Sequence, residues 1–325
     1  MSDMKRIIFF AIGVFAAFGV SYAQQDAQFS YYMNNALFYN PAYAGAENIT
    51  KITMLHRSQW SFYESSFDDG GAPQTQVFSL SSPIFKLRSG FGGHIVHDQL
   101  GAQNNLEVQG SYAYHLGFKD SKLSIGLRAG FFSQSLNWDR YRALEPEDPI
   151  LTNKTGRETQ IRPDLAGGIF YFHEKYYAGV SFNHLLRSTF DFGVAELRNA
   201  LSNHMFLTGG HYYNISTAAR LHSSFLMQTD FKQYNVTVST IMTMMERNQE
   251  KMWVGLSVRQ SEDIGLLLGY NMLKDKSLKF GYSFGYIWKD QAAKKPTSHE
   301  FLLIYQLPAI GKPDEKKEQN PRFRH

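Results

Sequence analysis

The sequence predicts an all-β protein: a transmembrane, up-and-down antiparallel β-barrel of about 14 strands, with an N-terminal segment or plug and a short charged tail. Three observations predict this fold. The chain begins with an export signal, and no later apolar run is long enough for a membrane-spanning helix. Apolar and small or polar residues alternate over stretches of about ten residues. Aromatic residues make up 15% of the chain, close to the 19% that are charged, which is typical of strands and membrane interfaces.

Residues 1–23 have the organisation of a secretory signal peptide. Lys5 and Arg6 precede the apolar run 7–20, and Ser21-Tyr22-Ala23 places small residues before a cleavage site. The run is shorter than the roughly 20 apolar residues of a spanning helix, which favours a cleaved signal over a retained anchor. The chain has no cysteine, which excludes a lipid-modified Gln24, disulfides and thiolate metal sites.

The alternation predicts which face of each strand contacts lipid. One predicted strand has an apolar or aromatic face made of Leu278, Phe280, Tyr282, Phe284 and Tyr286, and an opposite face made of Lys279, Gly281, Ser283 and Gly285. The same pattern recurs along 106–114, 123–131, 252–258 and 264–272. A soluble β-sandwich would also alternate, but its strands are nearer five or six residues long. Strand length, aromatic faces and export together favour the barrel.

The predicted barrel domain covers 49–307. Its strands are 49–57, 74–82, 89–97, 105–116, 122–133, 164–173, 175–183, 203–213, 218–228, 233–243, 251–260, 263–272, 277–287 and 298–307. Short periplasmic turns are expected at Phe118–Ser121, His173–Lys175, Asn214–Thr217 and Leu273–Ser277. Longer extracellular loops are expected at Gln59–Pro73, Ser135–Pro163, Asn183–Ser202 and Lys289–Thr297.

The segment 24–48, before the first strand, is the candidate plug or periplasmic docking segment. Asn40-Pro41 is a turn signal, and Gly45 permits a positive φ where the first strand begins. Because a barrel of this size has an interior wider than its own side chains fill, we expect either a plug or a conducting pore. A segment that only seals the barrel and a segment that also binds a partner both remain open. The tail, 308–325, is charged and contains proline, which is typical of disordered ends.

The sequence offers no catalytic or metal motif, and we expect a non-enzymatic protein without cofactor, metal or nucleic-acid partner. Gly281-Tyr-Ser283-Phe-Gly285 fits a nucleophile pattern, but it lies in mid-strand rather than at a strand-to-helix turn. Neither His211 nor His299 is placed beside Ser283 by any motif. Arg128, Arg220 and Arg259 fall on the predicted lumen face, where they would either be solvated or favour anions in a pore.

Residues 24–45, QQDAQFSYYMNNALFYNPAYAG, resemble the opening of the PorP/SprF family, outer-membrane components of the Bacteroidetes type IX secretion and gliding machinery. Ala27 and Tyr31 depart from the family pattern. The ending Asn320-Pro321-Arg322-Phe323 weakly resembles that of the family. The positions that match are Gln25, Asp26, Gln28, Phe29, Ser30, Tyr32, Met33, Leu37, Phe38, Tyr39, Asn40, Pro41, Ala42, Tyr43, Ala44 and Gly45.

This resemblance implies an outer-membrane barrel that supports export or surface attachment of cargo proteins and contacts the lipoproteins of a periplasmic ring. Outer-membrane lipid would surround it. The expected partner-binding or plug residues are Gln28, Phe29, Tyr32, Met33, Phe38, Tyr39, Asn40, Pro41, Tyr43 and Gly45, with Pro321, Arg322 and Phe323 as tail contacts. Two alternatives remain: a FadL-like hydrophobic-solute transporter with 24–48 as its hatch, and a general porin.

Overall fold

The computed structural model describes residues 26–61, 71–141, 154–193, 199–246, 249–260, 263–273, 277–288 and 297–309. The predicted signal peptide and nearly all of the predicted tail, including Pro321, Arg322 and Phe323, lie outside these ranges. No helix within the described ranges is long and apolar enough to cross a membrane.

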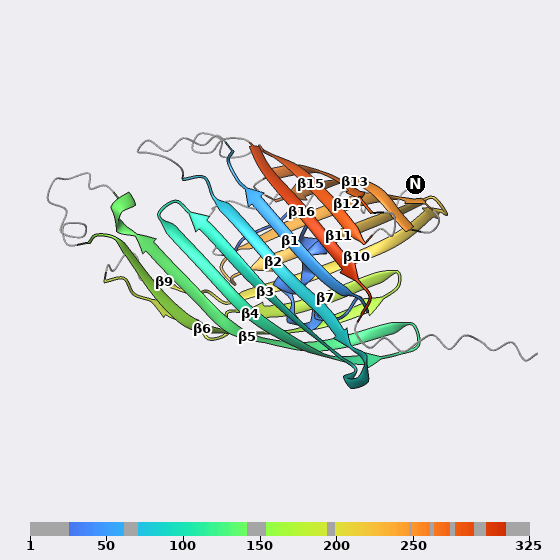
Figure 1. Ribbon diagram of the computed structural model, residues 1–325, viewed down its shortest axis with the longest axis horizontal. Helices are drawn as coiled ribbons and strands as arrows, with labels where there is room; N and C mark the ends of the chain where they lie inside the picture. The colour runs from blue at the N-terminus through green and yellow to red at the C-terminus, as the bar shows by residue number, and fades with distance from the viewer. Residues whose placement is uncertain are drawn as a thin grey trace, which may run out of the picture.

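Fourteen antiparallel strands form a closed barrel, which confirms the predicted fold (Figure 1). Each strand pairs with its neighbours along the chain, and β1 closes the ring by pairing with both β2 and β16. Lys51, for example, lies opposite Ser81 on one side and Gln306 on the other. The strands are β1 (Thr50–Ser58), β2 (Gln74–Ile84), β3 (Ser89–Leu100), β4 (Gln103–Gly117), β5 (Ser121–Asn137), β6 (Arg157–His173), β7 (Tyr176–Asn183), β10 (His204–Ser216), β11 (Ala219–Thr229), β12 (Tyr234–Glu246), β13 (Gln249–Arg259), β14 (Asp263–Asn271), β15 (Leu278–Ile287) and β16 (Thr297–Leu307).

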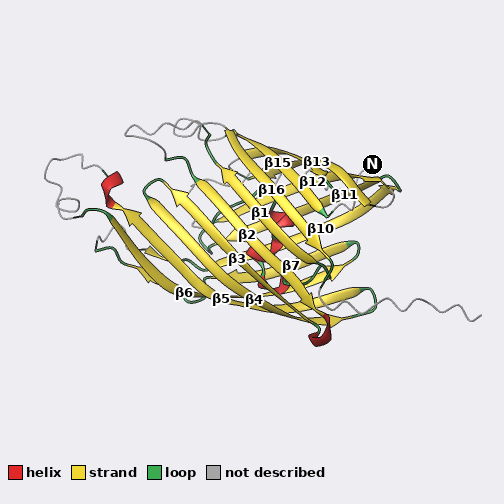
Figure 2. Ribbon diagram, in the orientation of Figure 1, coloured by secondary structure: helices red, strands yellow, loops and turns green. Residues whose placement is uncertain are grey.

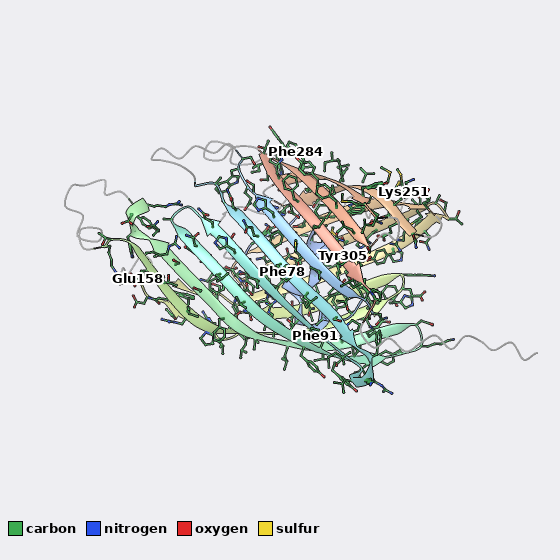
Figure 3. The ribbon with its side chains drawn as sticks, viewed as in Figure 1. Phe78, Phe91, Glu158, Lys251, Phe284 and Tyr305 are labelled. Atoms are coloured by element: carbon green, nitrogen blue, oxygen red, sulfur yellow. The ribbon has the colours of Figure 1, made fainter. Side chains whose placement is uncertain are left out.

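The predicted lipid-facing positions lie on the outer surface. Leu127 is 70% exposed, whereas its neighbours Gly126 and Arg128 are buried inside. Figure 3 labels Phe78, Phe91, Phe284 and Tyr305, all of which are exposed large hydrophobic residues of the barrel wall. A wall that is apolar outside and polar or small inside is the arrangement that a lipid bilayer requires.

Two of the predicted loops contain more regular structure than expected. β5 and β6 continue their ladder as far as the pair Asn137 and Arg157, so the predicted loop 135–163 shrinks to a shorter connection, which begins with the 3-10 helix η4 (Trp138–Arg140). Residues 157–163 are mostly polar on both faces, so their strand carries no apolar alternation to detect. Figure 1 shows β5, β6 and β9 at one extremity of the molecule.

The predicted loop 183–202 also contains a small two-stranded sheet, β8 (Thr189–Phe190) with β9 (Asn199–Ala200). Beside it lies a separate apolar cluster. Its buried members are Phe132, Leu136, Trp138, Phe190, Phe192 and Leu201. This end of the barrel is therefore more ordered than the pattern of turns and loops predicts.

The two ends of the barrel differ, and we name them by their connections. The loop rim is the end at which residues 58, 137, 183 and 287 leave their strands; the turn rim is the end at which residues 117, 173 and 216 do so. The N-terminal segment, residues 26–48, lies inside the barrel. It folds into three short helices, η1 (Tyr32–Asn34), α2 (Ala36–Tyr39) and η2 (Pro41–Tyr43), drawn red behind the strands in Figure 2.

Candidate functional site in the barrel lumen

The N-terminal segment crosses the lumen from the loop rim to the turn rim. Asp26 contacts His184, which follows the last residue of β7 at the loop rim. At the other end, the Lys122 ammonium, at the start of β5, donates to the Ala46 carbonyl at 2.9 Å. The segment therefore occupies the whole depth of the lumen between its first and last contacts.

Aromatic side chains of the segment pack together inside the lumen. Phe38 packs edge-on against Phe29, with ring centroids 5.5 Å apart, and Tyr39 packs against Phe206 of β10 at 5.3 Å. The inner wall supplies a complementary apolar surface. Its members in this cluster are Leu55, Val77, Val96, Phe206, Leu226, Ile241, Trp253, Leu267, Leu302 and Ile304. The predicted lumen face is mainly small and polar, so this apolar surface is an addition that the sequence patterns do not reveal.

A buried carboxylate holds the backbone at the start of η1. The two oxygens of Glu300 each accept one hydrogen bond, from the backbone amides of Ser30 and Tyr31, both at 2.8 Å. Arg57 lies 3.4 Å from Glu300 and also pairs with Asp263. Because a buried charge is costly unless it is paired, this network compensates the charge of Glu300 while anchoring the N-terminal segment.

Two tyrosine hydroxyls of the segment bind the inner wall. The Tyr31 hydroxyl donates to the carbonyls of Leu268 and Tyr282, and the Tyr32 hydroxyl lies 2.9 Å from the Ser224 hydroxyl. Burial raises the pKa of Tyr32 to about 12, so its phenol remains a neutral hydrogen-bonding group. Tyr31, which departs from the resembling family's pattern, is fully buried and makes specific contacts.

The turn predicted at Asn40-Pro41 packs against glycines of the barrel wall. The Asn40 side chain donates to the carbonyls of Ile169 and Val180, and its oxygen accepts from the Ala42 amide to begin η2. A Cβ on Gly126 of β5 would lie 2.3 Å from the Ala42 nitrogen, and one on Gly168 of β6 would lie 2.3 Å from Asn40 Oδ1. Only a wall without side chains at these points admits the turn.

Gly45 ends the turn in the conformation that the sequence predicts. Its φ is +68°, a region that glycine enters without strain. Its amide donates to the Ser81 hydroxyl at 2.8 Å, and its Cα would be 2.7 Å from a Cβ built on Gly90. The segment thus joins β1 through a close glycine-to-glycine contact with β3.

Polar contacts hold the segment at the turn rim. Glu47 accepts hydrogen bonds from the Tyr43 hydroxyl and the Lys51 ammonium, the latter at 3.1 Å. Burial alone would raise the pKa of the Glu47 carboxyl, but Lys51 and the Tyr43 hydrogen bond outweigh it and hold that pKa below its usual value. Tyr43 also packs edge-on against Phe170, with centroids 5.1 Å apart.

A histidine and carboxylate cluster lies at the loop rim. His184 Nε2 is 2.9 Å from Asp26 Oδ1, and His184 Nδ1 is 3.0 Å from Asp164 Oδ2. His204 Nδ1 lies 3.3 Å from Asp26 Oδ2. Burial alone would raise the pKa of Asp26, but His204 and His184 hold it well below its usual range. Asp26 is therefore a carboxylate linking the segment to two separate pieces of the barrel.

The arginines predicted to face the lumen are engaged in contacts. Arg128 donates to the Phe38 carbonyl at 2.7 Å, Arg220 pairs with Glu250, and Arg259 lies 3.6 Å from Asp263. Arg128 therefore anchors the N-terminal segment, while the other two neutralise wall carboxylates. These contacts favour a structural role for the arginines over anion conduction.

The ten predicted residues of the N-terminal segment all lie in the lumen. Gln28 accepts from Asn235 at 3.2 Å, and Met33 packs half-buried against the aromatic cluster. Each of the other eight is less than a tenth exposed. A partner could not reach these eight side chains without displacing the segment.

Most of the wall residues that receive the segment were not singled out from the sequence, although Arg128 was predicted to face the lumen. The residues that were not singled out lie in different strands or loops, and no local spacing connects them. They are Arg57, Glu300, His184 and the two glycines beneath the turn, Gly126 and Gly168. Ser283 points inward at 1% exposed, whereas His299 pairs with the Tyr282 hydroxyl on the other face of the sheet. The wall therefore separates this serine from this histidine.

Solved structures of outer-membrane barrels are similar to this chain. The toluene transporter TbuX of Ralstonia pickettii aligns at TM-score 0.48 and 10% identity, over 84% of this chain and 92% of its own. A deletion mutant of the monoaromatic hydrocarbon channel TodX aligns at 0.47 and 11%, over 83% and 93%. Omp33 of Acinetobacter baumannii aligns at 0.45 and 7%, over 80% and 98%.

Sequence comparison gives a more specific result. No curated protein sequence matches the chain. A family model does, and its description is type IX secretion system membrane protein PorP/SprF; the match covers residues 21–305. The match includes the N-terminal segment and the whole barrel except the last two residues of β16.

Proposed function

The chain belongs to the PorP/SprF family of type IX secretion system membrane proteins, and from this premise we propose that it acts as an outer-membrane anchor that holds a secreted cargo protein at the cell surface. In this proposal the loop rim contacts the cargo. The turn rim and the tail contact the periplasmic ring. The protein is an integral barrel of the outer membrane. Its contribution is to binding and attachment rather than to chemistry.

The observation that carries this proposal is the occupied lumen. The N-terminal segment is held at the loop rim by Asp26, in the middle by Asn40 and at the turn rim by Ala46. A polypeptide cannot pass beside a segment whose side chains pack on the wall around it, because a close-packed interior leaves no such space. The rims, rather than the lumen, are then the surfaces left for partners.

The ordered extension of the loop rim supports its assignment to cargo. β5 and β6 continue past the pair Phe131 and Pro163 to Asn137 and Arg157, beside the apolar cluster built around Trp138 and Phe190. An extension with its own small core gives a rigid base for the neighbouring connections, and rigid bases favour specific binding.

The experiment is affinity purification of the tagged protein from native outer membranes in mild detergent, followed by mass spectrometry. Two deletions test the two rims: residues 142–153 of the loop rim, replaced by a short glycine linker, and residues 310–325 of the tail. Deletion of 289–296, a second loop-rim connection, is the matched control. The proposal expects loss of cargo with retention of ring lipoproteins for the first deletion, and the reverse for the second.

The result that overturns the proposal is equally specific. If both deletion proteins still recover cargo and ring components, the rims are not the contacts. If the intact protein is recovered alone with a bound lipid or aromatic solute, it is a transporter. The transporter would need the aromatic plug to move, which a disulfide between the plug and the wall would prevent; the anchor should still work with the plug locked.

A further inference from the structure

We propose that Asp26, His184 and His204 bind a divalent transition-metal ion of the zinc type, which fastens the N-terminal segment to the loop rim. The three side chains offer one ligand atom each within 4.8 Å of one another. They come from three separate parts of the chain: the N-terminal segment, the connection after β7, and the first residue of β10.

The three ligand atoms lie close enough together for small side-chain movements to form a metal site. Ligand atoms that bind Zn²⁺ tetrahedrally at about 2.0–2.1 Å lie roughly 3.3 Å from one another. Here Asp26 Oδ1 is 2.9 Å from His184 Nε2, and Asp26 Oδ2 is 3.3 Å from His204 Nδ1. Small side-chain rotations therefore bring one carboxylate oxygen and two imidazole nitrogens around a common centre.

His204 supplies the independent observation. Its side chain is 2% exposed and its Nδ1 faces Asp26, yet no group in the described part of the chain makes a hydrogen bond to that nitrogen. The 3.3 Å contact with Asp26 lacks hydrogen-bond geometry. A buried imidazole nitrogen that lacks a hydrogen bond is costly, and a metal ion placed between it and the carboxylate removes that cost.

The neighbours of His184 are those of a metal-binding histidine. Asp164 accepts from His184 Nδ1 at 3.0 Å, which leaves Nε2 as the nitrogen that faces Asp26. Gln109 in turn donates to the same Asp164 oxygen at 3.0 Å, which fixes the carboxylate. Carboxylate-to-histidine contacts of this kind set the tautomer and orientation of metal-bound imidazoles. The set of two imidazoles and one carboxylate is one that zinc accepts, with a fourth position for water.

The functional consequence is attachment of the segment rather than catalysis. Near Asp26, two further contacts hold the described part of the segment to the wall: Gln28 accepts from Asn235, and the Ser30 and Tyr31 amides donate to Glu300. A metal bond from Asp26 to two barrel histidines would therefore keep the first residues of the segment inside the lumen. Removal of the ion would release this end first.

The test uses the mature protein in detergent, stripped with EDTA and titrated calorimetrically with Zn²⁺ alone. We expect binding of one ion per chain, weakened at least about 100-fold in Asp26→Asn and His204→Gln and about 10–100-fold in Asp164→Asn. His222→Gln is the matched control: this buried histidine stacks on Tyr212 elsewhere in the lumen, and its loss should leave binding unchanged. Co²⁺ in place of Zn²⁺ should give the visible bands of a tetrahedral site in the intact protein.

A second readout keeps the test valid if a wall variant fails to fold. Asp26→Asn alters only the N-terminal segment. A difference in gel mobility between heated and unheated samples would confirm that the barrel of this variant is closed. Zn²⁺ should raise the melting temperature of the intact protein and not that of Asp26→Asn. The proposal is overturned if the stripped protein takes up no stoichiometric Zn²⁺, or if Asp26→Asn and His204→Gln bind it as tightly as the intact chain.

Discussion

A methyl group added to Gly126 would lie 2.4 Å from the Ala42 Cα, closer than two non-bonded carbon atoms can approach. This contact joins strand β5 to the turn of the N-terminal segment, and nothing in either residue's neighbourhood in the sequence indicates it. The absence of a side chain at Gly126 is a condition for the plugged lumen.

Gly126→Ala should therefore loosen the segment. Overpacking of this kind costs about 1–3 kcal/mol, here taken from the docking of the segment onto the wall. The chain has no cysteine, so an Ala46→Cys reporter allows the labelling rate of the segment by a maleimide to be measured. Gly265→Ala is the control, because its added Cβ would meet its nearest neighbour at an ordinary 3.5 Å. Equal labelling of the two variants would contradict the prediction.

Asn40→Ala should weaken the same turn without a clash. It removes hydrogen bonds to the Ile169 and Val180 carbonyls and the cap on the Ala42 amide, at about 0.5–1.5 kcal/mol each, or about 1.5–4.5 kcal/mol together. Asn34→Ala, at a half-buried asparagine of η1, is the comparison. Hydrogen exchange of residues 36–44 should rise in the first variant only; unchanged protection would show that the wall glycines alone hold the turn.

The turn rim should become less stable in acid because of Glu47. A carboxyl whose pKa is lowered by folding contributes stability above its unfolded value of 4.5, and that contribution is lost as the pH falls below it through the folded value. The melting temperature of the intact protein should therefore fall more steeply below pH 4.5 than that of Glu47→Gln. Parallel curves for the two proteins would show that Glu47 is not the responsive group.

A charged side chain on the outer surface at mid-strand should lower the stability of the barrel. Leu127→Arg places a guanidinium where the chain now presents a side chain 70% exposed to lipid, at a cost of about 2–4 kcal/mol near the bilayer centre. Phe118→Arg, at the turn rim between β4 and β5, should cost about 0–1 kcal/mol, because charges near the interface remain hydrated. Urea unfolding in lipid vesicles measures both, and equal costs would place the membrane elsewhere on the barrel.

The strands were predictable because their signal is local. A lipid on one side and an enclosed interior on the other impose period two, and this pattern located all fourteen barrel strands to within a few residues except the start of β6. The first residues of β6, Arg157 to Pro163, were not predicted as strand because that stretch lacks apolar alternation. The turn at Asn40-Pro41 and the positive φ of Gly45 were likewise predictable, since each follows from the backbone chemistry of its own residues.

The lumen contacts could not be predicted because they depend on closure. Period two specifies that Gly126, Glu300 and His204 face inward, but it does not specify which of them face one another. That is decided by the order of fourteen strands and the register of every pair, which bring Glu300 to Tyr31 across 269 residues and His184 to Asp26 across 158. The sequence by itself determined a membrane barrel with a distinctive N-terminal segment. The tertiary structure decided that this segment fills the lumen, and it placed two histidines around the carboxylate of Asp26.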